Sequence, residues 1–200
     1  MAIEEEMDNG ELKRWCSFCR VPIHSTDEEF VSRVKERMKL YDAGAFYMLG
    51  QAYHYGDYDM SKDMKKALEL WKQAAQFGSV MAHFKVGVAY EEGQGIEKDM
   101  TKAVYHYKLA AIGGHETARD YLGVIEAKHG NMDRAMKHWM ISARAGYELC
   151  LQKVGQGYKD GYATKDEYAS TLRAYQAIID EMKSEERTKA AAKQKQNVSA

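Results

Sequence analysis

Small and apolar residues recur along the chain at a regular interval, with polar residues between them. The segments Gly50–Gly56, Gly87–Gly93 and Gly155–Gly161 share a Gly-x-x-Tyr-x-x-Gly frame. A second pattern, Lys-Ala followed by Ala-Ala and then Gly, stands at Lys66–Gly78 and returns 36 residues later at Lys102–Gly114. A fixed period of this length predicts stacked pairs of helices, each of which buries its apolar face only against a neighbour.

The apolar spacing within each period predicts a helix, a loop and a second helix. We expect helices at Ala43–Tyr55, Lys62–Gln76, Met81–Glu92, Lys98–Ile112 and Thr117–Lys128, and a long last helix that starts at the capping box Thr164-x-x-Glu167. The apolar stripe of Phe30, Val34 and Met38 predicts an opening helix that covers the first pair. The expected organisation is a disordered lead-in at 1–24, a capping helix at 25–42, a repeat solenoid at 43–187 and a disordered tail at 188–200.

Residues that recur at equal places in the repeats are expected to be packing residues. A glycine inside a helix costs about 1 kcal/mol relative to alanine, so a recurring one indicates close contact between helix backbones. Glycines that end a second helix are expected to be left-handed caps. The predicted set is Leu49, Gly50, Tyr53, Ala67, Gly78, Gly87, Tyr90, Ala103, Gly114, Gly123, Gly155 and Tyr158.

These residues resemble the Sel-1-like repeat family, which is related to the tetratricopeptide repeats. The segment Ala82–Gly114 follows the family pattern closely, with Gly93-Gln94-Gly95-Ile96 in the loop between its helices, and the preceding period matches nearly as well. The resemblance implies an all-α fold, a right-handed α-solenoid of about four helix pairs. It also implies a role in assembling protein complexes, and it carries no catalytic residues.

A second resemblance lies near the start of the chain. The segment Trp15–Pro22 is similar to the final Cys-x-x-Cys pair of a RING-type zinc finger, and some microalgal proteins, those of diatoms among them, place such a finger before Sel-1-like repeats. A structural zinc site takes four ligands. Here Cys16 and Cys19 supply two and His24 could be a third, but no His or Cys precedes Cys16. The favoured interpretation is a truncated finger without zinc; the alternative is a component of a ubiquitin-transfer system.

Charge and composition exclude several classes of function. The 29 basic and 30 acidic residues give a net charge of −1, which disfavours binding to nucleic acids or to an anionic membrane surface. No apolar run is long enough to cross a bilayer. Three cysteines in 200 residues do not form a disulfide scaffold, so we expect a reducing cytoplasmic or nuclear setting.

The remaining candidate site is a surface for a protein or peptide partner. By analogy with tetratricopeptide pairs, the concave face consists of the first-helix positions that flank the packed glycines, where polar and aromatic residues are mixed. These positions are Tyr47, Gln51, His54, Phe84, Val88, Glu91 and Lys159. A solvated face without a partner is the alternative. The histidines are scattered, and neither a phosphate-binding loop nor a nucleophile–base pair is evident, so the predicted function is a non-enzymatic adaptor without a cofactor.

Overall fold

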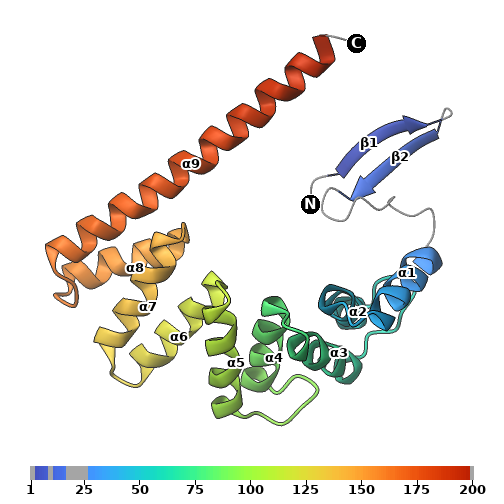
Figure 1. Ribbon diagram of the computed structural model, residues 1–200. Coiled ribbons are helices and arrows are strands. Elements are labelled where there is room, and N and C mark those ends of the chain that lie inside the picture. The colour runs from blue at the N-terminus through green and yellow to red at the C-terminus, as the bar shows by residue number, and fades with distance from the viewer. Residues whose placement is uncertain (1–2, 9–10, 17–26, 199–200) are drawn as a thin grey trace. The chain divides into compact units, whose positions relative to one another are not determined.

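The computed structural model describes residues 3–8, 11–16 and 27–198, with side chains described from 27 to 186. Within these residues the chain forms a two-stranded hairpin followed by nine helices (Figure 1). The elements are β1 (Ile3–Asp8), β2 (Glu11–Cys16), α1 (Asp27–Lys39), α2 (Ala43–Tyr55), α3 (Met64–Gln76), α4 (Val80–Glu92), α5 (Met100–Ile112), α6 (Glu116–Lys128), α7 (Met132–Arg144), α8 (Glu148–Lys159) and α9 (Lys165–Val198). The chain divides into two compact units, Met1–Asp99 and Met100–Ala200.

The predicted helices are confirmed, and capping explains where α3 and α4 start. The α3 helix begins at Met64, two residues later than expected, because the Asp63 side chain accepts a hydrogen bond from the Lys66 backbone N–H and so fixes the N-cap. The predicted capping box of α9 is formed: Thr164 Oγ1 accepts from the Glu167 backbone N–H, and the Glu167 carboxylate accepts from the Thr164 N–H.

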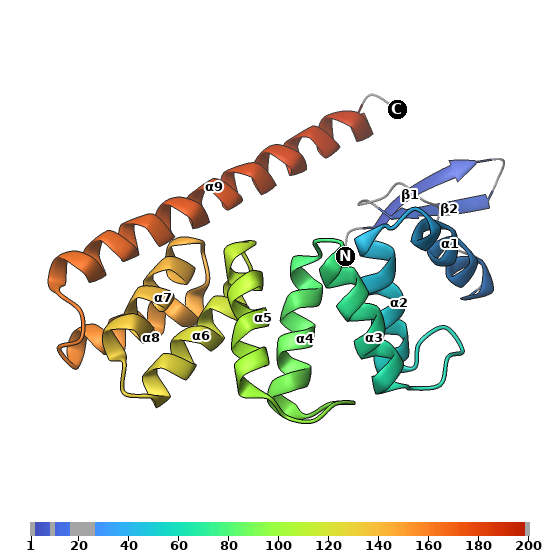
Figure 2. The same cartoon turned by 60° about the horizontal axis from the view of Figure 1, so that its bottom comes forward.

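In the first unit, α1 packs on α2, α2 on α3, and α3 on α4 (Figure 2). The α3 helix is at the centre of this packing, and its Trp71 is only 1% exposed. Asp42 joins the first two helices, because its carboxylate caps α2 through the Gly44 N–H and also accepts from the Arg37 guanidinium of α1 at 2.8 Å. Burial disfavours the charged form of Asp42, but Arg37 and the backbone N–H groups of Gly44 and Ala45 together outweigh this effect and hold the pKa of Asp42 below its ordinary value.

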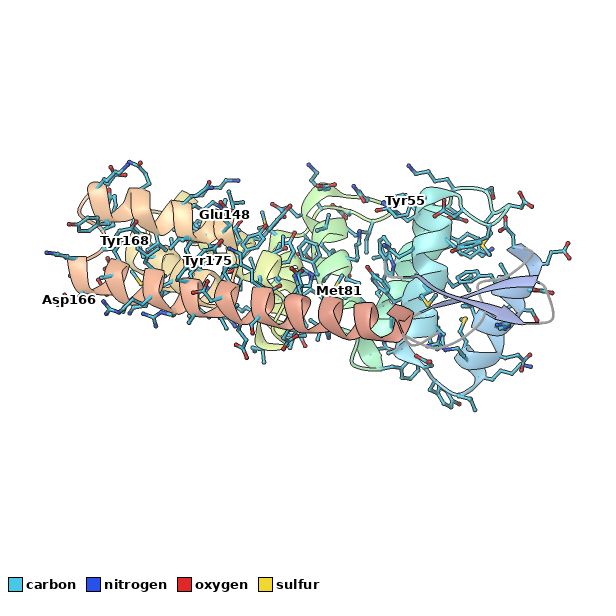
Figure 3. All side chains as sticks on the ribbon, turned by 90° about the horizontal axis from the view of Figure 1, so that it is seen from above. Tyr55, Met81, Glu148, Asp166, Tyr168 and Tyr175 are labelled. Atoms are coloured by element: carbon cyan, nitrogen blue, oxygen red, sulfur yellow. The ribbon has the colours of Figure 1, made fainter. Side chains whose placement is uncertain are left out.

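In the second unit, α5 packs on α6, α6 on α7, and α7 on α8. The last helix, α9, packs on both α7 and α8. The core of this unit is built around Met136, Trp139 and Met140 of α7 with Cys150 and Val154 of α8. Figure 3 shows Tyr168 on α9, whose ring stacks on that of Tyr158 of α8 with 5.3 Å between the centroids. The last helix therefore covers the end of the repeat array in this unit.

Close packing explains two of the recurring glycines. A Cβ placed on Gly50 would lie 2.5 Å from Cδ1 of Trp71, and one on Gly123 would lie 2.8 Å from Cδ1 of Trp139. In the fourth pair, however, the tight position is Gly157, where a Cβ would lie 2.7 Å from Cε of Met136. Gly155, the position expected from the repeat frame, has room for a Cβ at 3.6 Å from Tyr168.

The other residues of the predicted packing set differ in their burial. Gly78 and Gly114 have φ values of 89° and 92°, as expected of left-handed caps. The buried members of the predicted set are Leu49, Gly50, Ala67, Gly87, Tyr90, Ala103 and Gly123. Tyr53 is half-buried, with the Lys66 ammonium 4.6 Å from its ring centroid. The prediction is wrong for Tyr158, which is 38% exposed and covers Tyr168 instead of entering the core.

The structure differs from the expected disorder at both ends of the chain. In the lead-in predicted at 1–24, β1 and β2 pair as antiparallel strands, with Glu5 opposite Arg14. The sequence signal that we missed is Asn9-Gly10, a dipeptide typical of two-residue hairpin turns. In the tail predicted at 188–200, α9 continues to Val198, because this segment is rich in Ala, Lys and Gln, which are strong helix formers.

Candidate functional site

The candidate partner surface lies on the first helices of the first two pairs. Tyr47, Gln51 and His54 lie on α2, and the equivalent positions of α4 hold Phe84, Val88 and Glu91. All six side chains are half-buried, and all six belong to the first unit. We call these six residues the A-helix face. The seventh predicted residue, Lys159, is exposed on α8 and belongs to the second unit.

The indole ring of Trp71, in α3, lies beside this face. The His54 ring lies 5.3 Å from it, centroid to centroid, and the Lys85 ammonium of α4 lies 5.6 Å from its centroid. His54 also lies against Tyr55, whose side chain is 58% exposed at the end of α2 (Figure 3), and its Nδ1 is 2.9 Å from Sδ of Met64. A cation and an imidazole therefore lie beside one buried indole, and an exposed phenol lies against the imidazole.

The electrostatic field at His54 is positive. Burial lowers the pKa of His54, and the charges of Lys85 and Lys62 lower it further. Burial raises the pKa of Tyr47, with a further contribution from Tyr55. Both side chains are therefore neutral near pH 7, and the charges that act on His54 are those of Lys85 and Lys62.

Two buried polar atoms at this place lack a hydrogen-bond partner within the described part of the chain. They are Oε1 of Gln51 and Nε1 of Trp71. A buried polar atom without a partner is unfavourable by roughly 1–3 kcal/mol, so native proteins contain few of them. The Gln51 carbonyl on the A-helix face is therefore an acceptor for which the described part of the chain provides no donor.

The second unit contains a related polar cluster that sequence reasoning missed. Asp120 of α6 is only 5% exposed, and its carboxylate accepts a hydrogen bond from the Lys153 ammonium of α8 at 2.5 Å. The same ammonium lies 5.5 Å from the centroid of the Trp139 ring. Lys85 and Lys153 each follow their tryptophan by 14 residues, and that equal spacing was the available signal.

The third cysteine belongs to this cluster and to no metal site. Cys150 is fully buried, and burial raises the pKa of its thiol to about 12, so it stays protonated. Of the predicted zinc ligands, Cys16 ends β2, while Cys19 and His24 lie outside the described residues. Within the described part of the chain, no three His, Cys, Asp or Glu side chains come together as a metal site. The interpretation of Cys16 and Cys19 as a truncated finger stays a prediction.

Antiparallel helix pairs joined by short glycine-containing turns define a helix-pair repeat protein. The particular repeat is the Sel1 repeat, whose family description matches residues 44–78 and 80–115. These two segments belong to that family, as the sequence resemblance implied.

Curated relatives share parts of the chain. It is 34% identical over 67 residues to chitin synthase regulatory factor 3 of Schizosaccharomyces pombe, a match that covers 34% of this chain and 7% of the relative. It is 29% identical over 141 residues to the chitin synthase regulator SKT5 of Saccharomyces cerevisiae, and this match covers 66% of this chain and 20% of the relative. The chain thus spans a fifth or less of the length of these two relatives.

Solved structures confirm the predicted fold class. A Sel1 repeat protein from Oxalobacter formigenes aligns with a TM-score of 0.63 and 23% identity, covering 74% of this chain and 64% of the other. The protective antigen c5321 of uropathogenic Escherichia coli, described as displaying an SLR fold, aligns with a TM-score of 0.63 and 27% identity, covering 76% and 33%. The fold is therefore an all-α repeat of Sel1 type. Among the described residues, no helix is both long and apolar enough to span a bilayer.

Proposed function

We propose that this chain is a non-enzymatic adaptor that binds a protein partner through the A-helix face. The observation that carries the proposal is the half-buried mixture of polar and aromatic side chains at positions that the repeat pattern leaves free. These side chains include the Gln51 carbonyl, which has no donor within the described part of the chain. Rigid aromatic rings beside unpaired polar groups are typical of protein-binding hot spots.

The relatives support this proposal in a limited way. The Sel1 repeat is a scaffold for protein–protein interaction in general, and the two fungal relatives are named as regulators of another protein, chitin synthase. We extend to this chain only the role of acting through a protein partner. The near-zero net charge gives no reason to expect nucleic acid or membrane as the partner, and the few cysteines favour an intracellular place of action.

The test compares two quadruple alanine variants in partner capture by affinity purification and quantitative mass spectrometry. The first variant replaces Tyr47, Gln51, His54 and Phe84 of the A-helix face. The matched control replaces the exposed residues Lys65, Glu69, Gln73 and Gln76 of α3. We expect the first variant to lose the proteins that the wild type enriches and the control to keep them, while both retain the wild-type circular dichroism spectrum. Equal capture by all three proteins would show that the A-helix face does not bind the partner.

The zinc-finger alternative has its own measurement. If Cys16 and Cys19 belong to a metal site used in ubiquitin transfer, purified chain should contain about one zinc ion, and Cys16→Ser should remove it. A chain without zinc that still captures a partner through the A-helix face would favour the adaptor.

A further inference from the structure

Both compact units contain the same tryptophan–lysine arrangement. Trp71 is the eighth residue of α3, and Trp139 is the eighth residue of α7. Lys85 and Lys153 are the sixth residues of the helices that follow, α4 and α8, and their ammonium groups lie 5.6 and 5.5 Å from the respective ring centroids. Because position and geometry agree, the two arrangements are equivalent.

The two arrangements differ in what neutralises the lysine. In the second unit the fifth residue of α6 is Asp120, and its carboxylate pairs with Lys153. In the first unit the fifth residue of α2 is Tyr47, which supplies no carboxylate. Within the described residues, no carboxylate lies within ion-pair distance of Lys85. The charge that the chain provides in one unit is therefore missing from the other.

We propose that a partner supplies this charge: the Lys85 ammonium binds the carboxylate of an Asp or Glu side chain in a peptide segment that lies along α2 and α4. This inference rests on the proposed function, because it assigns a ligand chemistry to the A-helix face. The place taken by the partner carboxylate is the one that Asp120 takes in the second unit. We call the residues Tyr47, Gln51, His54, Trp71 and Lys85 the Trp71 site.

The surroundings of Lys85 suit an acidic segment. Lys62 and Lys85 make the field at His54 positive, and no acidic residue is among the groups that shift its pKa. The exposed Tyr55 ring offers apolar contact to a neighbouring side chain of the peptide.

The experiment uses the full chain and three pools of immobilised ten-residue peptides, random except for a central Asp, Asn or Lys. We expect the wild type to bind the Asp pool more strongly than the Asn pool by about tenfold, the effect of one hydrogen bond to a charged group. Lys85→Met should remove this preference, and Lys85→Arg should keep it. The matched control is Lys72→Met, since Lys72 lies 5.3 Å from the ring centroid of Tyr90 but outside the Trp71 site, and it should keep the preference.

A second variant imitates the other unit. Tyr47→Asp places a carboxylate at the position of Asp120, so we expect Lys85 to pair with it and the preference for the Asp pool to disappear. Tyr47→Asn removes the same phenol without adding a charge and should keep the preference. Circular dichroism verifies that both variants are folded.

The outcomes separate the two proposals. If wild type binds the Asp and Asn pools equally, the carboxylate inference is wrong, while capture that depends on the A-helix face would leave the adaptor function standing. If the preference for Asp survives both Lys85→Met and Tyr47→Asp, another basic group binds the acid and the inference is likewise overturned. Loss of the preference in these two variants alone supports it.

Discussion

Replacing Gly50 by alanine tests whether the contact between α2 and α3 is as close as the structure indicates. The new Cβ would lie 2.5 Å from Cδ1 and 2.6 Å from Nε1 of Trp71, and 3.2 Å from the Ala67 carbonyl oxygen. The closest of these is about 0.9 Å short of ordinary van der Waals contact. Trp71 is 1% exposed, and protein interiors are close-packed, so we expect the two helices to separate.

Two opposing terms set the size of the effect. Alanine is favoured over glycine inside a helix by about 1 kcal/mol. Overpacking of a well-packed core costs typically about 1–3 kcal/mol. We therefore expect Gly50→Ala to destabilise the protein by roughly 0–2 kcal/mol in the net. Gly155→Ala is the matched control, because its Cβ would meet only Tyr168 at 3.6 Å, and it should stabilise by about 1 kcal/mol.

Thermal unfolding followed by circular dichroism measures both changes. For a chain of this size, 1 kcal/mol corresponds to about 2–4 °C in Tm. Gly155→Ala should raise the Tm by that amount, and Gly50→Ala should lower it or, at most, leave it unchanged. If Gly50→Ala raised the Tm as much as Gly155→Ala, the close contact with Trp71 would be refuted, and the recurring glycine would need another explanation.

Three further results are expected. Lys153→Met should destabilise the fold by about 2 kcal/mol or more, since it leaves the Asp120 carboxylate buried and unpaired. Lys85→Met, by contrast, should change the free energy of unfolding little. Urea titration measures both changes. Stability should fall as the pH drops below about 6.5, because burial lowers the pKa of three histidines and the unfolded chain therefore takes up protons first. These histidines are His54, His83 and His138. Melting curves at several pH values measure how steeply stability depends on pH, and this dependence should be shallower in the control variant His83→Gln. In a variant lacking the other two cysteines, the Cys150 thiol should react with iodoacetamide only after unfolding, since its pKa is about 12 and it is fully buried; mass spectrometry detects the adduct.

The helix pairs could be predicted from sequence because their signals are local and repeated. Glycine and alanine recur wherever a first helix touches a second, and caps such as Asp42 and Ser79 precede the helices that they start. The repeat pattern was a less reliable guide in α8, where the residues around it depart from the pattern. In α8 the frame singles out Gly155, but the close contact, with Met136, is at Gly157. Two glycines two residues apart lie on different sides of a helix, so only the position of α7 decides which one is packed.

The candidate site could be predicted only in part. Tyr47, Gln51 and His54 were proposed because the repeat pattern leaves their positions free, and their binding role stays a prediction. Lys85 was missed because an isolated lysine on a helix is ordinarily a solvated residue, and its role depends on a ring that comes 14 residues earlier. The pair of Asp120 and Lys153 was missed for a similar reason, since 33 residues separate the two partners.

Comparison of equivalent positions explains how one repeat can both stabilise a fold and bind a ligand. The eighth residue of α2, α4 and α6 is glycine. In α2 and α6 this residue is constrained to glycine because a tryptophan of the following helix lies against it. The fifth residue has no such constraint, and it is Tyr47, Phe84 and Asp120 in the three helices. A carboxylate at this place costs little in α6 because Lys153 neutralises it inside the unit. In the first unit Tyr47 stands at this place, and in the proposed site Lys85 keeps its charge for a ligand. A change at one position that the fold tolerates would thus convert a structural ion pair into half of a binding site.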